Sequence, residues 1–435
     1  MTLSRRIFAA AFFGVAVLLC GCQGSSDSVT ASRIEIAQSS APEAAFTVTQ
    51  SPAPISQQVD ITYFGSRDIS AAAELYTANN GGSVNIERGS GANYLNELSA
   101  RINADNSPDL CDKTDNTYPY LMSMNLYEDL TDYIDITSPQ WSDINDIIEQ
   151  YSFKGGRYFY PTSVKIMPQL LLYVKSTYVQ CGNLPDPEKL WLKGEWTWET
   201  FRQGARGVID SGESTATLLV SGVNVFDNLL ATTGDPLFPR TGSRFVNGFM
   251  SENTARVNEL LSAYDVSCSR VFDVEKEMSR AVFLSGDEQT FAKLRSTDLA
   301  VGAVPYPRAD DSDEYYCKAV TEGFLVPKGA KNIQSAASFI NYSRVAAISP
   351  EQRQRDRKAL IESGLLRSDV EWLENLRGSM RLKPVIVGGE CFDSETNAAV
   401  HKILDSGGKS SWGENVAENS PVIDKALEKI NAITE

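Results

Sequence analysis

Residues 59–111 most constrain what this chain can fold into, because strand-type and helix-type patterns alternate along them. Short β-branched or aromatic runs are followed by segments whose apolar side chains recur at helical spacing. The predicted elements are a strand at 59–64, a helix from residue 69, a strand at 84–88, a helix at 94–104 and a strand at 109–111. Such a βαβαβ unit forms a parallel sheet with right-handed crossovers. We therefore predict an α/β fold.

Open parallel sheets bind their ligands beyond the carboxyl ends of the strands. In residues 59–111 each predicted strand is followed by a polar loop. These candidate binding loops are 65–68, 88–93 and 112–118. We therefore expect binding side chains in these loops.

A second compact unit is predicted after residue 160. An aromatic strand at 158–160 is expected to end at Pro161, because proline lacks a backbone donor. After a polar break, the apolar run 170–174 enters a new core. The 435 residues are enough for two domains that each bury a core. The chain is therefore predicted to cross here between two lobes, with a ligand held at the crossing.

Composition excludes several classes of function. A formal net charge of −16 disfavours nucleic acid as a partner, since such a partner requires a basic face. His401 is the one histidine, so a zinc hydrolase or a Ser/Cys–His catalytic site is not expected. Phosphate-loop and dinucleotide-binding motifs are absent from the sequence. We expect no catalytic residues, metal or cofactor, although a pair of carboxylates for glycan hydrolysis stays open because Asp and Glu are abundant.

The N-terminus has the pattern of an export signal. Arg5 and Arg6 precede the apolar run 7–19, which is too short to span a bilayer. The run ends in Leu-Cys-Gly-Cys, which resembles the lipobox of bacterial lipoproteins. This resemblance predicts a signal peptide at 1–21 and palmitate or another acyl chain on Cys22, which would anchor the protein at the extracytoplasmic face of the cell membrane. The polar segment 22–58 is predicted to be a flexible tether.

Two smaller interpretations concern aromatic residues and thiols. Thr197 is a natural helix N-cap, and Trp196 and Phe201 have the spacing of a hydrophobic staple, so both rings are assigned to a helix start. Five cysteines beyond the lipobox show no metal-type or disulfide-dense spacing, and we interpret them as buried thiols.

Several segments in order resemble a family 1 extracellular solute-binding protein, the carbohydrate-type receptor of an ABC importer. They include VDITYFGSRD, SPDLCDKTDNTYPYLMSMNLYEDLTDYID, YFYPTSVKIMPQLLLYVKSTYVQCGN, GEWTWETF, TTGDPLF, VGAVPYPR and EGFLVPKGAKNIQSAASFINYS. The resemblance implies a two-lobed periplasmic-binding-protein-like fold of type II, with hinge-connected lobes around a ligand cleft. It assigns lobe one to 59–162 with a return segment at 291–313. Lobe two is then 163–290, continued by 314–435.

The resemblance also implies which side chains would bind a sugar. Sugar rings stack on aromatic faces, and their hydroxyls need paired donors and acceptors. The candidate ligand-binding residues are Arg67, Asp68, Asp115, Tyr118, Tyr160, Lys165, Glu322, Phe324 and Trp412. Of these we favour Asp115, Tyr160 and Trp412.

The function implied is that of a monomeric, non-enzymatic receptor. It would bind a carbohydrate, most simply an oligosaccharide, close its hinge around it and deliver it to the permease subunits. Two alternatives stay open. The same fold could bind a peptide, a polyamine or another charged solute, or the protein could be a lipid-anchored glycan hydrolase.

Overall fold

The computed structural model describes residues 59–433, apart from 90, 182–183, 214–215, 221–224, 264–266, 271–272, 279–280, 298 and 390. The predicted signal peptide 1–21, the tether 22–58 and Cys22 lie outside the described residues. Among the helices that are described, none combines the length and the apolar character that crossing a membrane requires.

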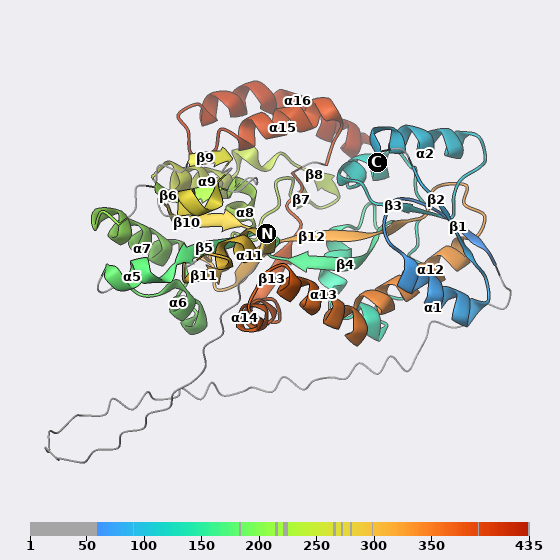
Figure 1. Cartoon of the computed structure of the whole chain (residues 1–435). Helices are drawn as coiled ribbons and strands as arrows, with labels where there is room; N and C mark the ends of the chain where they lie inside the picture. The colour runs from blue at the N-terminus through green and yellow to red at the C-terminus, as the bar shows by residue number, and fades with distance from the viewer. Residues whose placement is uncertain are drawn as a thin grey trace, which may run out of the picture. The chain divides into compact units, whose positions relative to one another are not determined.

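The predicted βαβαβ unit is confirmed (Figure 1). Its elements are β1 (Ile61–Phe64), α1 (Ser70–Asn80), β2 (Val84–Glu87), α2 (Tyr94–Asn103) and β3 (Leu110–Asp112). β1 pairs in parallel with both β2 and β3. The apolar face expected on α1 is buried, since Ala72 is 5% exposed and Tyr76 is fully covered. Gly81 ends α1 in the left-handed conformation that glycine adopts without steric cost.

A long strand from the C-terminal half of the chain completes this first sheet. β12 (Tyr315–Leu325) pairs in parallel with β13 (Leu382–Val385) and antiparallel with β3 and with β4 (Tyr160–Ile166). The order of the sheet is β13-β12-β3-β1-β2, with β4 paired to β12. The first sheet therefore joins segments that are more than 200 residues apart in the sequence.

The expectation that the strand ends at Pro161 is wrong. β4 begins at Tyr160 and continues through Pro161 to Ile166, with Pro161 opposite Gly323. The pairing register shifts between Glu322 and Gly323, next to this pair. A bulge of this kind tolerates a residue without an N–H, so the strand does not have to stop at proline.

A second sheet is built from five strands in the order β11-β5-β10-β6-β9. They are β5 (Leu170–Val174), β6 (Ala216–Val220), β9 (Ser267–Arg270), β10 (Ala281–Gly286) and β11 (Val301–Val304). β6 runs parallel to β9 and β10, whereas β5 runs antiparallel to β10 and β11. All five residues of β5 are buried, as expected for the apolar run at 170–174.

Sheet membership does not follow the expected lobe boundaries. The return segment 291–313 was assigned to lobe one, but its strand β11 pairs with β5 in the second sheet. The return to the first sheet is made by β12, in the part of the chain that was assigned to lobe two. Both runs form strands, and the pairing in the structure shows which sheet each strand joins.

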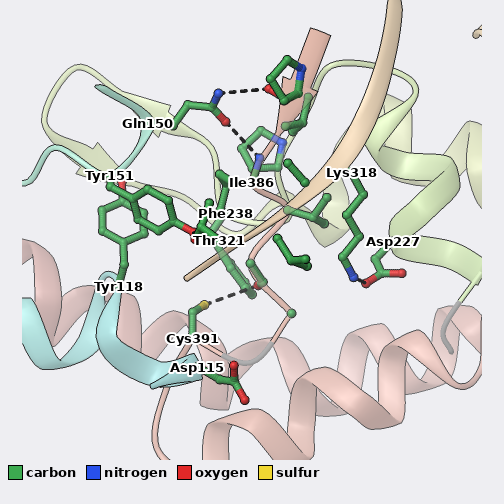
Figure 2. Close-up of a pocket in the computed structure, with 18 of the residues that line it drawn as sticks. Asp115, Tyr118, Gln150, Tyr151, Asp227, Phe238, Lys318, Thr321, Ile386 and Cys391 are labelled. Atoms are coloured by element: carbon green, nitrogen blue, oxygen red, sulfur yellow. Dashed lines mark hydrogen bonds and ion pairs between the residues drawn. The ribbon is translucent and has the colours of Figure 1, made fainter. Parts of the chain in front are cut away.

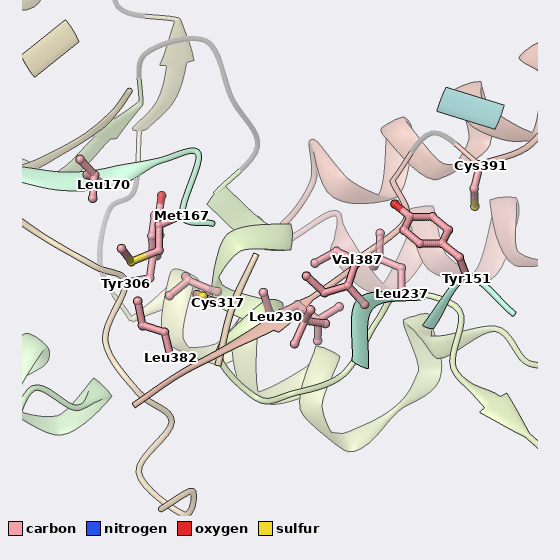
Figure 3. Packing of buried hydrophobic residues seen from close by; sticks show 14 of the residues in the cluster. Tyr151, Met167, Leu170, Leu230, Leu237, Tyr306, Cys317, Leu382, Val387 and Cys391 are labelled. Atoms are coloured by element: carbon pink, nitrogen blue, oxygen red, sulfur yellow. The ribbon is translucent and has the colours of Figure 1, made fainter. Parts of the chain in front are cut away.

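Helices cover both sheets, and their hydrophobic residues form one large buried cluster. Figure 3 shows part of this cluster, from Leu170 and Tyr306 to Val387 and Tyr151. α1 packs against α12, and α15 lies beside α16 (Figure 1). The longer helices include α4 (Asn145–Gln150), α7 (Trp198–Asp210), α8 (Val225–Ala231), α9 (Glu252–Ser262), α11 (Glu288–Arg295), α12 (Ile333–Ala347), α13 (Pro350–Glu362), α14 (Arg367–Arg377), α15 (Ser394–Leu404) and α16 (Trp412–Ala432).

Two local predictions are confirmed. The hydroxyl of Thr197 accepts a hydrogen bond from the backbone of Thr200 at the start of α7, and the rings of Trp196 and Phe201 meet edge to face with centroids 6.1 Å apart. These contacts match the expected cap and staple. The interpretation of the cysteines as buried thiols holds for Cys111, Cys317 and Cys391 and is wrong for Cys181, which is partly exposed; the side chain of Cys268 lies outside the described part of the chain.

Candidate ligand-binding site

The main cavity of the described residues has a volume of about 810 Å³. Figure 2 shows it between the loop after β3, α4, α8, β12 and the segment that follows β13. The polar and aromatic residues that line it include Lys113, Asp115, Tyr118, Gln150, Tyr151, Asp227, Phe238, Arg240, Phe245, Tyr316, Lys318, Thr321, His401 and Asp405.

The position of the cavity follows from the direction of the strands. Lys113 and Asp115 come directly after β3, at its carboxyl end. Val225 and Asp227 lie on α8, the next helix after β6 of the second sheet. Segments that follow the carboxyl ends of β3 in the first sheet and β6 in the second sheet therefore line one cavity. Open α/β sheets bind ligands at this end of their strands.

Aromatic side chains form one wall. The ring of Tyr118 meets Tyr151 edge to face at 5.2 Å and Phe245 at 5.7 Å between centroids. Tyr151 and Phe245 are buried, whereas Tyr118 is half-buried and lines the cavity. Burial raises the pKa of Tyr118 to about 12, so its phenol is neutral at physiological pH. This wall offers an apolar face with a neutral hydroxyl.

A second wall is held together by hydrogen bonds visible in Figure 2. The side-chain amide of Gln150 donates to the carbonyl of Pro384 at 3.1 Å and accepts from the backbone of Ile386 at 2.9 Å. The hydroxyls of Tyr151 and Thr321 are 2.7 Å apart. These bonds tie α4 to β13 and β12, so the walls of the cavity are largely preformed.

An ion pair joins a strand of the first sheet to a helix that follows a strand of the second sheet. Lys318 on β12 donates to the carboxylate of Asp227 on α8, and the Asp227 side chain is only 7% exposed. A buried carboxylate needs such a partner, because leaving it alone in the interior costs several kcal/mol. The pair therefore connects the first sheet to a helix of the second-sheet region at the edge of the cavity.

Two of the residues predicted from the sequence, Asp115 and Tyr118, line this cavity. The others lie elsewhere. Asp68 binds the backbone and hydroxyl of Ser70 and so caps α1. Tyr160 is fully buried and donates to the carbonyl of Leu130 at 3.3 Å. The side chains of Asp68 and Tyr160 therefore make contacts within the protein and do not line the cavity.

A second group of predicted residues meets near the carboxyl end of β12. The Arg67 guanidinium lies 4.5 Å from the ring centroid of Phe324 and donates to the carbonyl of Gly323 at 3.0 Å. Arg67 also approaches the exposed Glu322 carboxylate at 3.7 Å. Phe324 is 1% exposed. Arg67, Glu322 and Phe324 are thus brought together, but none of them lines the cavity described above.

Trp412, the predicted sugar-stacking residue of the C-terminal part, is partly buried and packs against the hydrophobic cluster. Its ring stacks on Phe226 with centroids 4.7 Å apart, and it contacts Phe249 edge to face. Trp412 does not line the main cavity. Its position at the start of α16 orients it toward α8, which the sequence pattern could not show.

Lys165 takes part in an ion cluster that links β4 to α11 and α14. Its ammonium donates to Glu288 at 2.9 Å, and the same carboxylate binds Arg377. Burial raises the pKa of Glu288, but attraction to Arg377 and Lys165 outweighs it, so this pKa lies below its ordinary value.

We expect the Glu288 cluster to stabilise the fold in a pH-dependent way. Because the folded-state pKa is lowered, the stabilisation is present above the ordinary carboxyl pKa and is lost as the pH falls through the folded value. The free energy of unfolding, measured in urea, should decrease between pH 7 and pH 3 in the wild type. In Glu288→Gln this decrease should be smaller. The exposed Glu362→Gln is the control. A Glu288→Gln profile parallel to wild type would contradict this role.

Sequence reasoning missed most of the cavity. Tyr316 and the consecutive residues 318–321 of β12 line it, so the alternation of a strand does not by itself select them. Arg240 begins the two-residue strand β7 (Arg240–Thr241), and Phe238 lies just before it. Among the described residues, no group of three or more His, Cys, Asp or Glu could hold a metal ion.

Comparison with known proteins identifies the type of fold. Residues 71–248 match the family model of bacterial extracellular solute-binding proteins. The resemblance predicted from the sequence is confirmed. No curated protein matches the sequence. The solute-binding family and the similar structures are those of binding proteins, not of enzymes.

Solved structures show the same two-lobed fold at low identity. The sugar-binding protein MalE from Xanthomonas citri is 16% identical, with 86% of this chain and 99% of that chain covered and a TM-score of 0.60. A family 1 extracellular solute-binding protein from Bifidobacterium longum subsp. infantis is 13% identical, with 87% and 99% covered and a TM-score of 0.58. A cyclic α-maltosyl-1,6-maltose binding protein from Arthrobacter globiformis is 14% identical, with 87% and 99% covered and a TM-score of 0.56. At these identities the likeness establishes the fold and leaves the ligand to the site itself.

Proposed function

We propose that this solute-binding protein is the receptor of an ABC importer and binds a carbohydrate, most simply an oligosaccharide, in the cavity beside Tyr118. The observation that carries the proposal is one cavity of about 810 Å³ that combines aromatic rings with hydrogen-bonding side chains. Rings bind the C–H faces of sugars, and polar groups pair with hydroxyls. The names of the similar structures, which include sugar-binding proteins, support the same class of ligand.

The lining also bears on the alternatives. A polyamine site would require carboxylates in excess over cations. Here the cations are Lys113, Arg240 and Lys318, and the carboxylates are Asp115, Asp227 and Asp405. Asp227 is already paired with Lys318. A polyamine is therefore a poorer fit than a sugar, while a hydrolase would reveal itself by releasing reducing ends from a glycan.

Further parts of the proposal concern location and delivery. Lipidation of Cys22 would hold the monomeric receptor on the outer face of the membrane, and the segment 22–58 would act as its tether. Residues 59–162 and 163–290 are proposed to contribute mainly to different lobes, with β12 as the return to the first. Ligand that contacts loops of both sheets would favour the closed arrangement, which the permease would recognise.

We expect a glycan to raise the unfolding temperature of the purified protein. A ligand present at about 100 times its dissociation constant stabilises the folded state by roughly 2.7 kcal/mol. The measurement is a thermal-shift screen of mono- and oligosaccharides, with peptides and polyamines as the comparison set. Small-angle scattering with any hit should show compaction. A shift with peptides or polyamines alone would overturn the carbohydrate assignment.

A further inference from the structure

Lys113 occupies an unusual position in the cavity wall. It follows β3, and its backbone donates to the carbonyl of Gly323 on β12, so the main chain is held between two strands. Its ammonium lies 5.9 Å from the ring centroid of the buried Phe159, and Lys113 is one of the residues that line the cavity. Within the described part of the chain, this ammonium makes neither a hydrogen bond nor an ion pair.

The absence of a partner has an energetic consequence. A lysine ammonium taken out of water needs compensating hydrogen bonds or an opposite charge. Burial lowers the pKa of Lys113, and the attraction of Asp115 and Glu322 does not make up the difference. By contrast, Lys318 in the same cavity is satisfied by Asp227. The ammonium of Lys113 therefore has no directly bonded counter-ion within the described part of the protein.

Arg240 is a second cation of the cavity without a carboxylate partner in the described residues. Its guanidinium donates to the backbone carbonyls of Ser152 at 2.8 Å and Glu149 at 3.2 Å, and to the hydroxyl of Ser152. These neutral acceptors fix its orientation, and the exposed side chain leaves the guanidinium accessible to a ligand. Asp115 and Asp405 also line the cavity, so an acidic ligand would be selected by the local surroundings of Lys113 and Arg240 and not by the total charge of the lining.

We infer that the solute is an acidic saccharide whose carboxylate, as in a uronic acid, pairs with Lys113 while its ring lies against the aromatic wall. Arg240 would bind a second anionic or hydroxyl group of the same ligand. An ammonium partly removed from water gains most from a ligand anion, because the pair forms in a medium less polar than water. This inference rests on the proposed carbohydrate-binding function and specifies its class of substrate.

The test compares neutral and acidic sugars of the same length and linkage. Isothermal titration calorimetry would use oligogalactose against oligogalacturonate and glucose-containing against glucuronate-containing disaccharides, with a sulfated disaccharide to distinguish ester sulfate from carboxylate. We expect the preferred uronate to bind at least about tenfold more tightly than its neutral counterpart. Tighter binding of the sulfated sugar than of every uronate would overturn the assignment to a carboxylate.

Variants then test Lys113 itself. Lys113→Gln should abolish the preference for the acidic sugar over the neutral one, whereas Lys113→Arg should keep the preference. Lys358→Gln, at an exposed lysine of α13, is the matched control, and melting curves verify folding. If neutral sugars bind as tightly as acidic ones, or if Lys113→Gln keeps the preference, the inference fails while the proposed function stands. If no saccharide of either kind binds, both fail.

Discussion

Replacing Tyr118 with alanine is expected to weaken saccharide binding by about 2 kcal/mol, or roughly 30-fold. The half-buried ring of Tyr118 lines the cavity, and the edges of Tyr151 and Phe245 hold it in place. A ring that is already oriented loses little conformational freedom when a sugar stacks on it. The measurement is the dissociation constant of the glycan found in the thermal-shift screen.

Two controls separate stacking from folding. Tyr118→Phe keeps the ring and should bind within about threefold of wild type if the hydroxyl contributes little. Trp412→Ala removes the ring that the sequence pointed to, but that ring packs on Phe226 away from the cavity. It should lower the melting temperature without a comparable loss of affinity. An unchanged affinity for Tyr118→Ala, or a loss with Trp412→Ala alone, would contradict the proposed aromatic wall.

Arg344→Met is expected to lower the free energy of unfolding by about 3 kcal/mol. The Arg344 side chain is 4% exposed. Its guanidinium donates to the carbonyls of Gln140 at 3.0 Å and Thr162 at 3.1 Å and to both carboxylate oxygens of Asp143. One side chain of α12 therefore holds β4 and the loop before α4. Removing it leaves buried carbonyls without donors.

Urea unfolding measures this loss. The matched control is Arg357→Met on α13, where the arginine is 38% exposed and pairs with Glu371 and Glu374 at 3.0 Å each. Exposed pairs contribute well under 1 kcal/mol each, so this variant should unfold close to wild type. Equal losses in the two variants would mean that burial of the Arg344 charge has no special effect on stability.

Much of the fold was accessible from the sequence because its signals are local. The positions of β1, α1, β2, α2 and β3 follow from hydrophobic spacing and from turn residues such as Gly81. The cap at Thr197 and its staple were predicted for the same reason. The order of segments also indicated a resemblance to solute-binding proteins, and residues 71–248 match the model of that family.

The binding residues were less accessible because each depends on distant neighbours. Tyr160, Phe324 and Trp412 are aromatic residues beside predicted loops. Phe324 packs against Tyr63 and Trp412 against Phe226, both far away in the sequence, and Tyr160 is buried against Trp141. Local sequence cannot distinguish a ring that faces a cavity from one that fills a core.

The sequence by itself determined the α/β class, the first parallel strands and the loop after β3 that brings Asp115 and Tyr118 to the cavity. Only the tertiary structure decided that β11 joins the second sheet while β12 joins the first, and that β12 presents Tyr316 and Lys318 to the cavity. It alone revealed that Lys113 lacks the counter-ion that Lys318 has. The reason is physical: helices and turns form through contacts a few residues apart, whereas the pairing of β12 with β4 and the ion pair of Lys318 with Asp227, 91 residues apart, are long-range contacts.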